Sequence, residues 1–442
     1  MGLHAEIRRA IYEQHLEEAT FLYAQRRRAW VDPELTLPDV AALDDRLEAH
    51  LDGLVLGDHE ARALCLAACA EEDPGTVYST LCVLCRQNEL SPLLESLEAL
   101  ALAEPDVLQA VGDAWVVEWP DSWQIRLLDL LARGRRELLA PLARVAGSRR
   151  WTAAGPALLA AAADSGTDPM TARVCLAAVG DMGFTPAREP LRACVDRGDP
   201  ALAPQAAIAL LKLGVALHPA DLRYNGRELP SWASIPLALG GTISARQLEP
   251  LLDGADGSPD AALGCGLLGD PSALPSLLAA LSHPPLSAAA ATALLLLSGV
   301  ELREQVEVVE PPDPTLDDDL VDAEAEADVR APVNDTPVRP TTQVRLARDP
   351  VRWREALGEL SRSHNPVRAG QVLSVASTAT ALRSLCLPRA VRQYLLDDLK
   401  IRGHVEARLC AEAPVLQQTA VWSSLRTDPT RPFRSGSDQP RV

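Results

Sequence analysis

The chain has 442 residues, 47% of them hydrophobic and only 4% aromatic, and it carries a formal net charge of −19. Nucleic-acid-binding proteins usually present a basic face and anionic membranes attract basic segments, so this charge argues against nucleic acid and membrane as partners. The apolar residues are mainly Ala, Leu and Val, and a surplus of Ala and Leu over aromatic residues favours helices. The composition therefore predicts an all-α protein.

The cysteines and the apolar stretches predict the compartment. Most of the nine cysteines stand in apolar runs, which is typical of reduced thiols in the cytoplasm. The start of the chain is charged throughout and lacks the apolar core of a signal peptide. The most apolar stretch, 286–300, is too short and too rich in Ala and Ser to span a bilayer. We therefore expect a cytoplasmic protein.

The first predicted element is a long helix over Ala5–Trp30, which makes up most of an N-terminal helical cap at residues 1–38. Its Arg26-Arg27-Arg28 cluster suits the polar outer end that a stack of repeats requires. Over 39–150 the apolar periodicity continues, but no Gly-Asp turn recurs there at a regular interval to separate the helices. We therefore predict degenerate HEAT-like helix pairs there.

Residues 151–300 carry the clearest internal repeat. Helices end at glycines at intervals of roughly 30 residues, and prolines such as Pro169 and Pro259 open the next helices. Glycine tolerates the positive φ found past a helix end, and proline loses no hydrogen bond at the first helical position. This pattern of paired amphipathic helices predicts an α-solenoid. The terminating glycines are Gly180, Gly214, Gly240, Gly269 and Gly299.

The repeat unit resembles a known type. The segments Asp168–Leu191 and Pro259–Leu281, with the turns Gly180-Asp181 and Gly269-Asp270, are similar to the short bacterial HEAT repeat of the phycobilisome-lyase-like kind. Through these repeats and Gln417-Gln418, the whole chain resembles an uncharacterised proteobacterial family of HEAT-repeat proteins. The resemblance implies a solenoid of HEAT-like hairpins. Some members are encoded near components of type VI secretion, which implies an accessory role in such a system.

Beyond residue 300 the composition changes. Acidic residues and prolines dominate 301–342, and this segment has too little apolar surface to offset the entropy lost on ordering. We predict a disordered acidic linker there. A small helical region is expected over 343–426, with helices that include Val367–Ala376 and Arg389–Leu399, and the tail 427–442 is expected to be disordered.

Two cysteine pairs have the short spacing of a metal site. Cys65 and Cys69 are followed by Cys82 and Cys85, and two such pairs can offer zinc four thiolate ligands. Both pairs, however, stand in apolar segments predicted to be helical rather than on a turn. This setting is typical of cysteines that serve as small core residues. We therefore interpret them as core residues and keep zinc as the alternative.

Three tryptophans, Trp115, Trp119 and Trp123, recur at intervals of four residues. On one continuous helix they would form an aromatic stripe able to anchor a partner protein. Pro120 interrupts that helix, and large aromatic side chains at such a bend fill the junction between repeats. The pattern leaves a core junction and a partner-binding surface as alternatives.

No pattern of reactive residues points to catalysis. The histidines have no metal-binding spacing, and there is no phosphate-binding loop or nucleophile elbow, so we expect no catalytic or cofactor-binding residues and no enzyme activity. The expected function is a non-catalytic scaffold or adaptor that binds a protein partner on the concave surface of the solenoid. The alternative is a HEAT-type enzyme or modifier, either bilin-lyase-like or a nucleic-acid repair protein.

Overall fold

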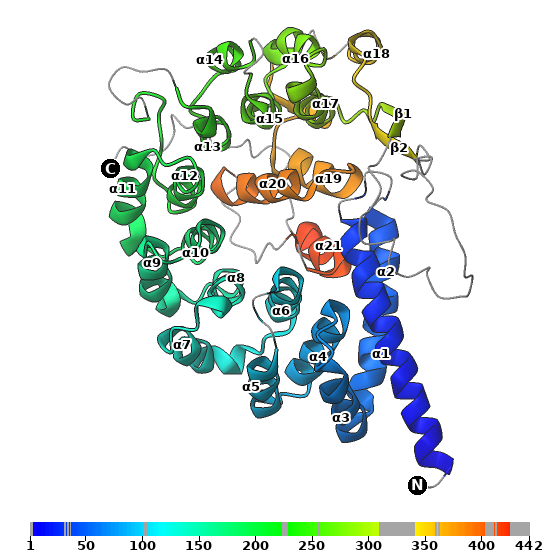
Figure 1. Ribbon diagram of the computed structural model, residues 1–442. Coiled ribbons are helices and arrows are strands. Elements are labelled where there is room, and N and C mark those ends of the chain that lie inside the picture. The colour runs from blue at the N-terminus through cyan, green and yellow to red at the C-terminus, as the bar shows by residue number, and fades with distance from the viewer. Residues whose placement is uncertain are drawn as a thin grey trace, which may run out of the picture.

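The structure of the protein is a computed structural model, and it is helical almost throughout (Figure 1). The residues that it describes are 3–30, 32, 35, 37–100, 102, 104–222, 229–253, 257–308, 341–358, 360, 363–402, 411 and 413–424. None of the helices in this described part combines the length and apolar character needed to cross a bilayer. The predicted all-α class is confirmed.

The helices of the first part are α1 (Leu3–Ala29), α2 (Leu37–Leu56), α3 (Asp58–Cys69), α4 (Pro74–Arg86), α5 (Leu90–Ala99), α6 (Pro105–Glu118), α7 (Gln124–Ala132), α8 (Leu139–Arg149), α9 (Gly155–Ala163) and α10 (Pro169–Asp181). Those of the second part are α11 (Arg188–Arg197), α12 (Ala203–Lys212), α13 (Ser234–Gly240), α14 (Ala245–Leu248), α15 (Pro259–Leu268), α16 (Leu274–Ala280), α17 (Pro284–Ser298), α18 (Pro350–Ala356), α19 (Val375–Ser384), α20 (Arg389–Ile401) and α21 (Val415–Ser424).

From α3 to α17 the helices form an arc with an inner and an outer row (Figure 1). The inner helices α4, α6, α8, α10, α12, α13, α15 and α17 pack successively on one another, while helices such as α5, α7, α9 and α11 lie outside them. One large apolar core runs along the arc, and a smaller separate cluster lies among α1 to α4. This stacking confirms the predicted α-solenoid.

Glycine serves the solenoid in two different ways. Gly214, Gly269 and Gly299 stand just past a helix with φ of 79°, 75° and 72°, as predicted. Gly180 instead lies inside α10, where an added Cβ would come within 2.7 Å of Cα of Ala209 on α12. The prediction for Gly180 was wrong because this glycine permits close helix approach rather than a turn.

The same close approach recurs along the inner row. A Cβ on Gly147 would lie 2.9 Å from Cα of Ala178, and one on Gly266 would lie 2.7 Å from Cα of Ala293. Gly240 is also not a turn residue, because it is the last residue of α13 and the positive φ of 64° falls on Gly241. Inner helices thus stack through contacts between glycine and alanine.

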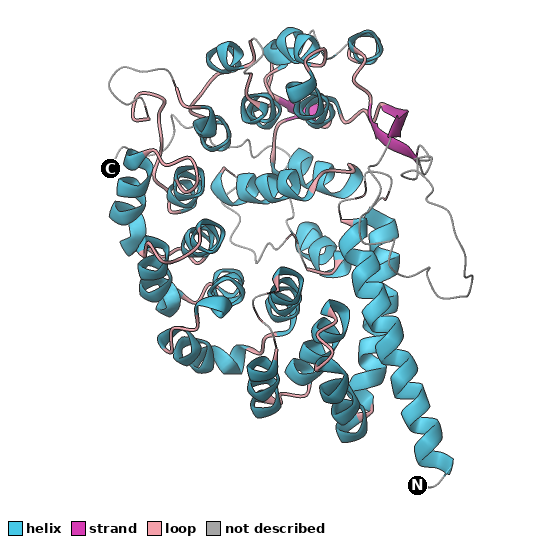
Figure 2. Ribbon diagram, viewed as in Figure 1, coloured by secondary structure: helices cyan, strands magenta, loops and turns pink. Residues whose placement is uncertain are grey.

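Two small hairpins interrupt the helices after α17 (Figure 2). β1 (Arg303–Val308) pairs antiparallel with β2 (Thr341–Leu346). The linker predicted over 301–342 is therefore too wide at both ends, since its alternating apolar and polar residues at 303–308 find a partner strand. The rest of that prediction, 309–340, lies outside the described residues, as does the predicted tail 427–442.

The second hairpin consists of β3 (Val367–Arg368) and β4 (Gln371–Val372), which pair antiparallel. A helix was predicted over Val367–Ala376, and this prediction was wrong for its first half. Ala369 and Gly370 both have positive φ, 49° and 72°, which makes a tight two-residue turn between strands and ends any helix.

The C-terminal helices α19, α20 and α21 lie inside the arc, whereas α18 lies beside α16 at its end (Figure 1). α20 contacts α12 and α13 of the inner row, α21 contacts α2, and β3 contacts α17. The sequence left open whether the helical region predicted over 343–426 stacks on the solenoid, and the structure places its helices α20 and α21 on the concave side.

Candidate functional site

The four cysteines singled out in the sequence lie on α3 and α4, and all are buried. Burial raises the pKa of Cys65 to about 12 and that of Cys69 to about 11, as expected for thiols packed in an apolar core. In the described part of the chain, no three His, Cys, Asp or Glu side chains are grouped so that they could hold a metal ion. Cys82 and Cys85 belong to the same apolar core as the neighbouring leucines.

The three tryptophans are buried at a bend. α6 ends at Glu118, and after Pro120 the residues Asp121–Trp123 form a short 3₁₀ turn. Neighbouring rings meet edge to face, with centroids 4.7 Å apart for Trp115–Trp119 and 5.5 Å apart for Trp119–Trp123. Trp115 and Trp119 are 0% exposed and Trp123 is 5% exposed, so they fill the junction and a partner has no access to them in this conformation.

The chain's only two lysines meet on the concave side of the solenoid. Lys212 Nζ of α12 lies 2.9 Å from Asp181 Oδ1 and 2.7 Å from Asp397 Oδ1, and Lys400 Nζ of α20 lies 2.6 Å from the same Asp181 oxygen. Burial opposes ionisation of Asp181, but the two ammonium groups outweigh it and lower the pKa of Asp181. Burial likewise opposes the charge on Lys212, but Asp181 and Asp397 raise its pKa. Asp181 and Lys212 therefore stay ionised and are poor proton acceptors or donors at neutral pH.

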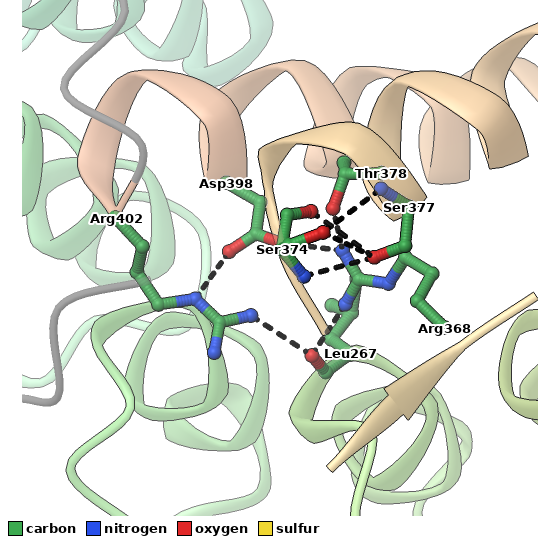
Figure 3. Close-up of polar contacts among 7 residues, drawn as sticks. All are labelled: Leu267, Arg368, Ser374, Ser377, Thr378, Asp398 and Arg402. Carbon is green, nitrogen blue, oxygen red and sulfur yellow. Dashed lines mark hydrogen bonds and ion pairs between the residues drawn. The ribbon is translucent and has the colours of Figure 1, made fainter. Parts of the chain in front are cut away.

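A second buried cluster surrounds Asp398 of α20 (Figure 3). Arg368 Nη1 and Arg402 Nε each donate a hydrogen bond of 2.5 Å to its carboxylate. Both guanidinium groups also donate to the carbonyl oxygen of Leu267, at 2.6 Å and 3.1 Å. Leu267 lies in the last turn of α15, where carbonyl groups lack helical donors and cations are favoured. The cluster therefore fastens β3 and α20 to the end of a solenoid helix.

The backbone of the second hairpin adds to this attachment. The Val367 N–H donates to the Gly269 carbonyl at 2.7 Å, and the Ala369 N–H donates to the Leu296 carbonyl at 2.8 Å. The hairpin thus satisfies carbonyl groups at the ends of α15 and α17 that have no donor within their own helices.

At the other side of the arc, α21 is held by the N-terminal helices. The buried carboxylate of Asp44 on α2 accepts hydrogen bonds from Arg26 Nε at 2.5 Å and from the Val415 backbone N–H at 2.7 Å. The C-terminal region therefore spans the concave side from α15 to α2. The concave surface that the sequence suggested for a partner is covered there by the chain itself.

An open groove of ≈ 810 Å³ lies elsewhere, between α1 and α3. Small and apolar side chains line it, and Ala63 and Ala67 are exposed there because short side chains leave space between the helices. These lining residues are Ala5, Tyr12, Leu16, Ala63, Leu64, Ala67 and Ala68.

Carboxylates dominate the charged residues of this groove. Among the described residues, Glu13, Glu17, Glu60 and Glu71 line it, with Arg9 as the one base. Glu13 pairs with Arg9 at 2.8 Å and Glu60 pairs with Arg8 at 2.8 Å. Glu17 and Glu71 form no ion pair within the described residues. The groove therefore combines small and apolar side chains with an excess of carboxylates.

Comparison of the chain with models of known protein families, with curated proteins and with solved structures found no match.

Proposed function

We propose that this protein is a non-catalytic scaffold or adaptor of the HEAT-repeat type, and that it binds a protein partner in the groove between α1 and α3. The observation that carries the proposal is the open groove itself, which is lined by small and apolar side chains and by four carboxylates. Contiguous apolar surface with a polar rim is characteristic of protein-binding sites. The concave side is a poorer candidate, because α20 and α21 already cover it.

The partner that this groove suits is an amphipathic helix. An amphipathic helix binds in a groove through one apolar stripe, and the short alanine side chains leave room for it. The polar residues on either side of that stripe would contact the carboxylates of the groove. Since Glu17 and Glu71 have no cationic partner among the described residues, the flanking residues should be Lys or Arg. Some members of the family that the chain resembles are encoded near components of type VI secretion. We therefore also propose that the partner is a component of such a bacterial secretion system.

The experiment is co-purification from the native host after mild cross-linking, with quantitative mass spectrometry of the bound proteins. Ala67→Arg places a long, charged side chain at an exposed position of the groove and should lower partner recovery at least about tenfold. Ala160→Arg is the matched control, because Ala160 is an exposed alanine on the outer helix α9.

The proposal predicts that one protein is recovered in comparable amounts with the wild type and with Ala160→Arg, and is lost with Ala67→Arg. Recovery of the same protein with all three chains would refute the groove as the binding site. Recovery of no protein with the wild type would refute the scaffold function.

A further inference from the structure

A cavity of ≈ 260 Å³ lies where the two ends of the arc approach each other. The end of α1, strand β2 and the residues that lead into α20 form its walls. Its apolar wall includes Trp30, Leu37, Leu385 and Leu387. A concave, mainly apolar space with a few polar groups is the usual form of a small-molecule site.

Arg392, in the first turn of α20, lines this cavity and is only 3% exposed. Its Nη1 donates to the Leu382 carbonyl at 3.1 Å, and the guanidinium carbon lies 5.1 Å from the ring centre of Trp30 and 5.8 Å from that of Trp422. Its Nη2 donates to Gln418 Oε1 at 3.4 Å, whereas its Nε has no hydrogen-bond partner among the described residues. Within the described residues no carboxylate pairs with Arg392.

The other arginines that lie deeply buried in the described part of the chain each contact a carboxylate, which makes Arg392 unusual. Arg26 donates to Asp44, and Arg368 and Arg402 donate to Asp398. A buried charge without a counterion is costly, and burial lowers the pKa of Arg392 to about 10. A bound anion would supply the missing counterion.

Other charges around the cavity also favour an anion. Arg348 lines it, is half-buried, and forms no ion pair within the described residues. Among the described residues that line the cavity, five are arginines and two are carboxylates. Arg303 pairs with Glu301 at 2.9 Å and Arg345 pairs with Glu304 at 2.8 Å, whereas Arg348 and Arg392 have no paired carboxylate in the described part. This local excess of positive charge stands in a chain whose net charge is −19.

The N-terminus of α20 adds backbone donors to the same place. Pro388 and Arg389 line the cavity, and Pro388 stands at the helix N-cap, where it offers no side-chain acceptor. The first N–H groups of a helix lack partners within the helix and carry a partial positive charge, which attracts anions.

We propose that this cavity binds a small organic anion, with a carboxylate or phosphate group against Arg392 and Arg348 and a short apolar body against the tryptophan and leucine side chains. The ligand joins residues from α1, β2 and α20, so it links the N-terminal cap to the C-terminal region.

Isothermal titration calorimetry of the full chain in a chloride buffer of fixed ionic strength tests this site. The probes are hexanoate for the carboxylate, phenyl phosphate for the phosphate, and hexanamide as the neutral counterpart of hexanoate. Arg348→Gln removes a half-buried arginine that no described residue pairs with, so the variant should fold. Arg192→Gln is the control, because Arg192 on α11 is also half-buried and without an ion pair in the described part.

The proposal predicts saturable single-site binding of hexanoate or phenyl phosphate to the wild type, and the tighter of the two identifies the charged group. Arg348→Gln should weaken that binding at least about tenfold, as expected for loss of a charge-assisted contact, whereas Arg192→Gln should leave it unchanged. Equal binding of hexanamide, equal binding by Arg348→Gln, or no saturable heat with either anion would each overturn the proposal.

Discussion

Replacement of Asp398 by asparagine should release the C-terminal region from the concave side. Asp398 and Arg368 are both 0% exposed in the cluster that joins α20 to the end of α15. The asparagine side chain would keep the shape of the aspartate but lack its charge, which leaves Arg368 and Arg402 buried without a counterion. Removal of one partner from a buried ion pair typically costs about 3–5 kcal/mol of stability.

A surface pair gives the matched control. Asp129 pairs with Arg126 at 3.3 Å, and both side chains are about half exposed, at 48% and 59%. Water and salt screen such pairs, so Asp129→Asn should change the unfolding free energy by less than about 1 kcal/mol. The difference between the two changes in unfolding free energy measures how much burial strengthens the effect of losing the carboxylate charge.

Two measurements together test this prediction. Urea unfolding reports the loss of stability, although a solenoid can unfold in several steps, so a local measurement is also needed. Amine labelling with peptide mass spectrometry supplies it, because Lys212 and Lys400 are the only lysines and are 3% and 16% exposed in their side chains.

In the wild type both lysines should react slowly, because both are largely covered and paired with Asp181. Asp398→Asn should speed the labelling of Lys400, which lies two residues further along α20, and then of Lys212. If Asp398→Asn behaves like Asp129→Asn in both assays, the argument that buried ion pairs hold the C-terminal region in place is wrong.

Two further substitutions test other features of the fold. Gly180→Val should destabilise the protein by about 1–3 kcal/mol through overpacking, because a Cβ at Gly180 would lie 2.7 Å from Cα of Ala209. Gly358→Ala is the control, because Gly358 is exposed and an added Cβ there would come no closer than 3.7 Å to another atom. It should change the unfolding free energy in urea by less than about 0.5 kcal/mol. Equal effects of the two substitutions would show that close packing at Gly180 does not matter for stability. The second substitution concerns His50, whose pKa is lowered by burial and by His15; the two Nδ1 atoms lie 3.1 Å apart. Because the unfolded chain then binds a proton more readily than the folded one, His50 should not reduce the unfolding free energy above about pH 6.5. The unfolding free energy should fall as the pH drops from there through the lowered pKa. Urea unfolding at several pH values should show this fall in the wild type and a smaller one in His50→Gln, and an unchanged fall would rule out His50 as its source.

The sequence alone determined the helical class, the solenoid and many of the positions where its helices end. The N-terminal helix predicted over Ala5–Trp30 is observed at Leu3–Ala29, and Gly214, Gly269 and Gly299 end helices as expected. The bend after Trp119 was also visible, since Pro120 cannot continue a helix. These features depend on backbone preferences of neighbouring residues, which a local pattern records directly.

Only the tertiary structure decided where the C-terminal region lies and what the concave side can bind. Lys400 pairs with Asp181, 219 positions away, and Arg368 bonds to the carbonyl of Leu267, 101 positions away. Gly180 matches the pattern of a turn residue, yet its role is set by Ala209 on another helix. The groove between α1 and α3 likewise depends on how the N-terminal cap packs against the first helices of the solenoid. A charged residue or a glycine has the same local signature whichever distant segment it meets, so its long-range partners are fixed only when the whole core closes.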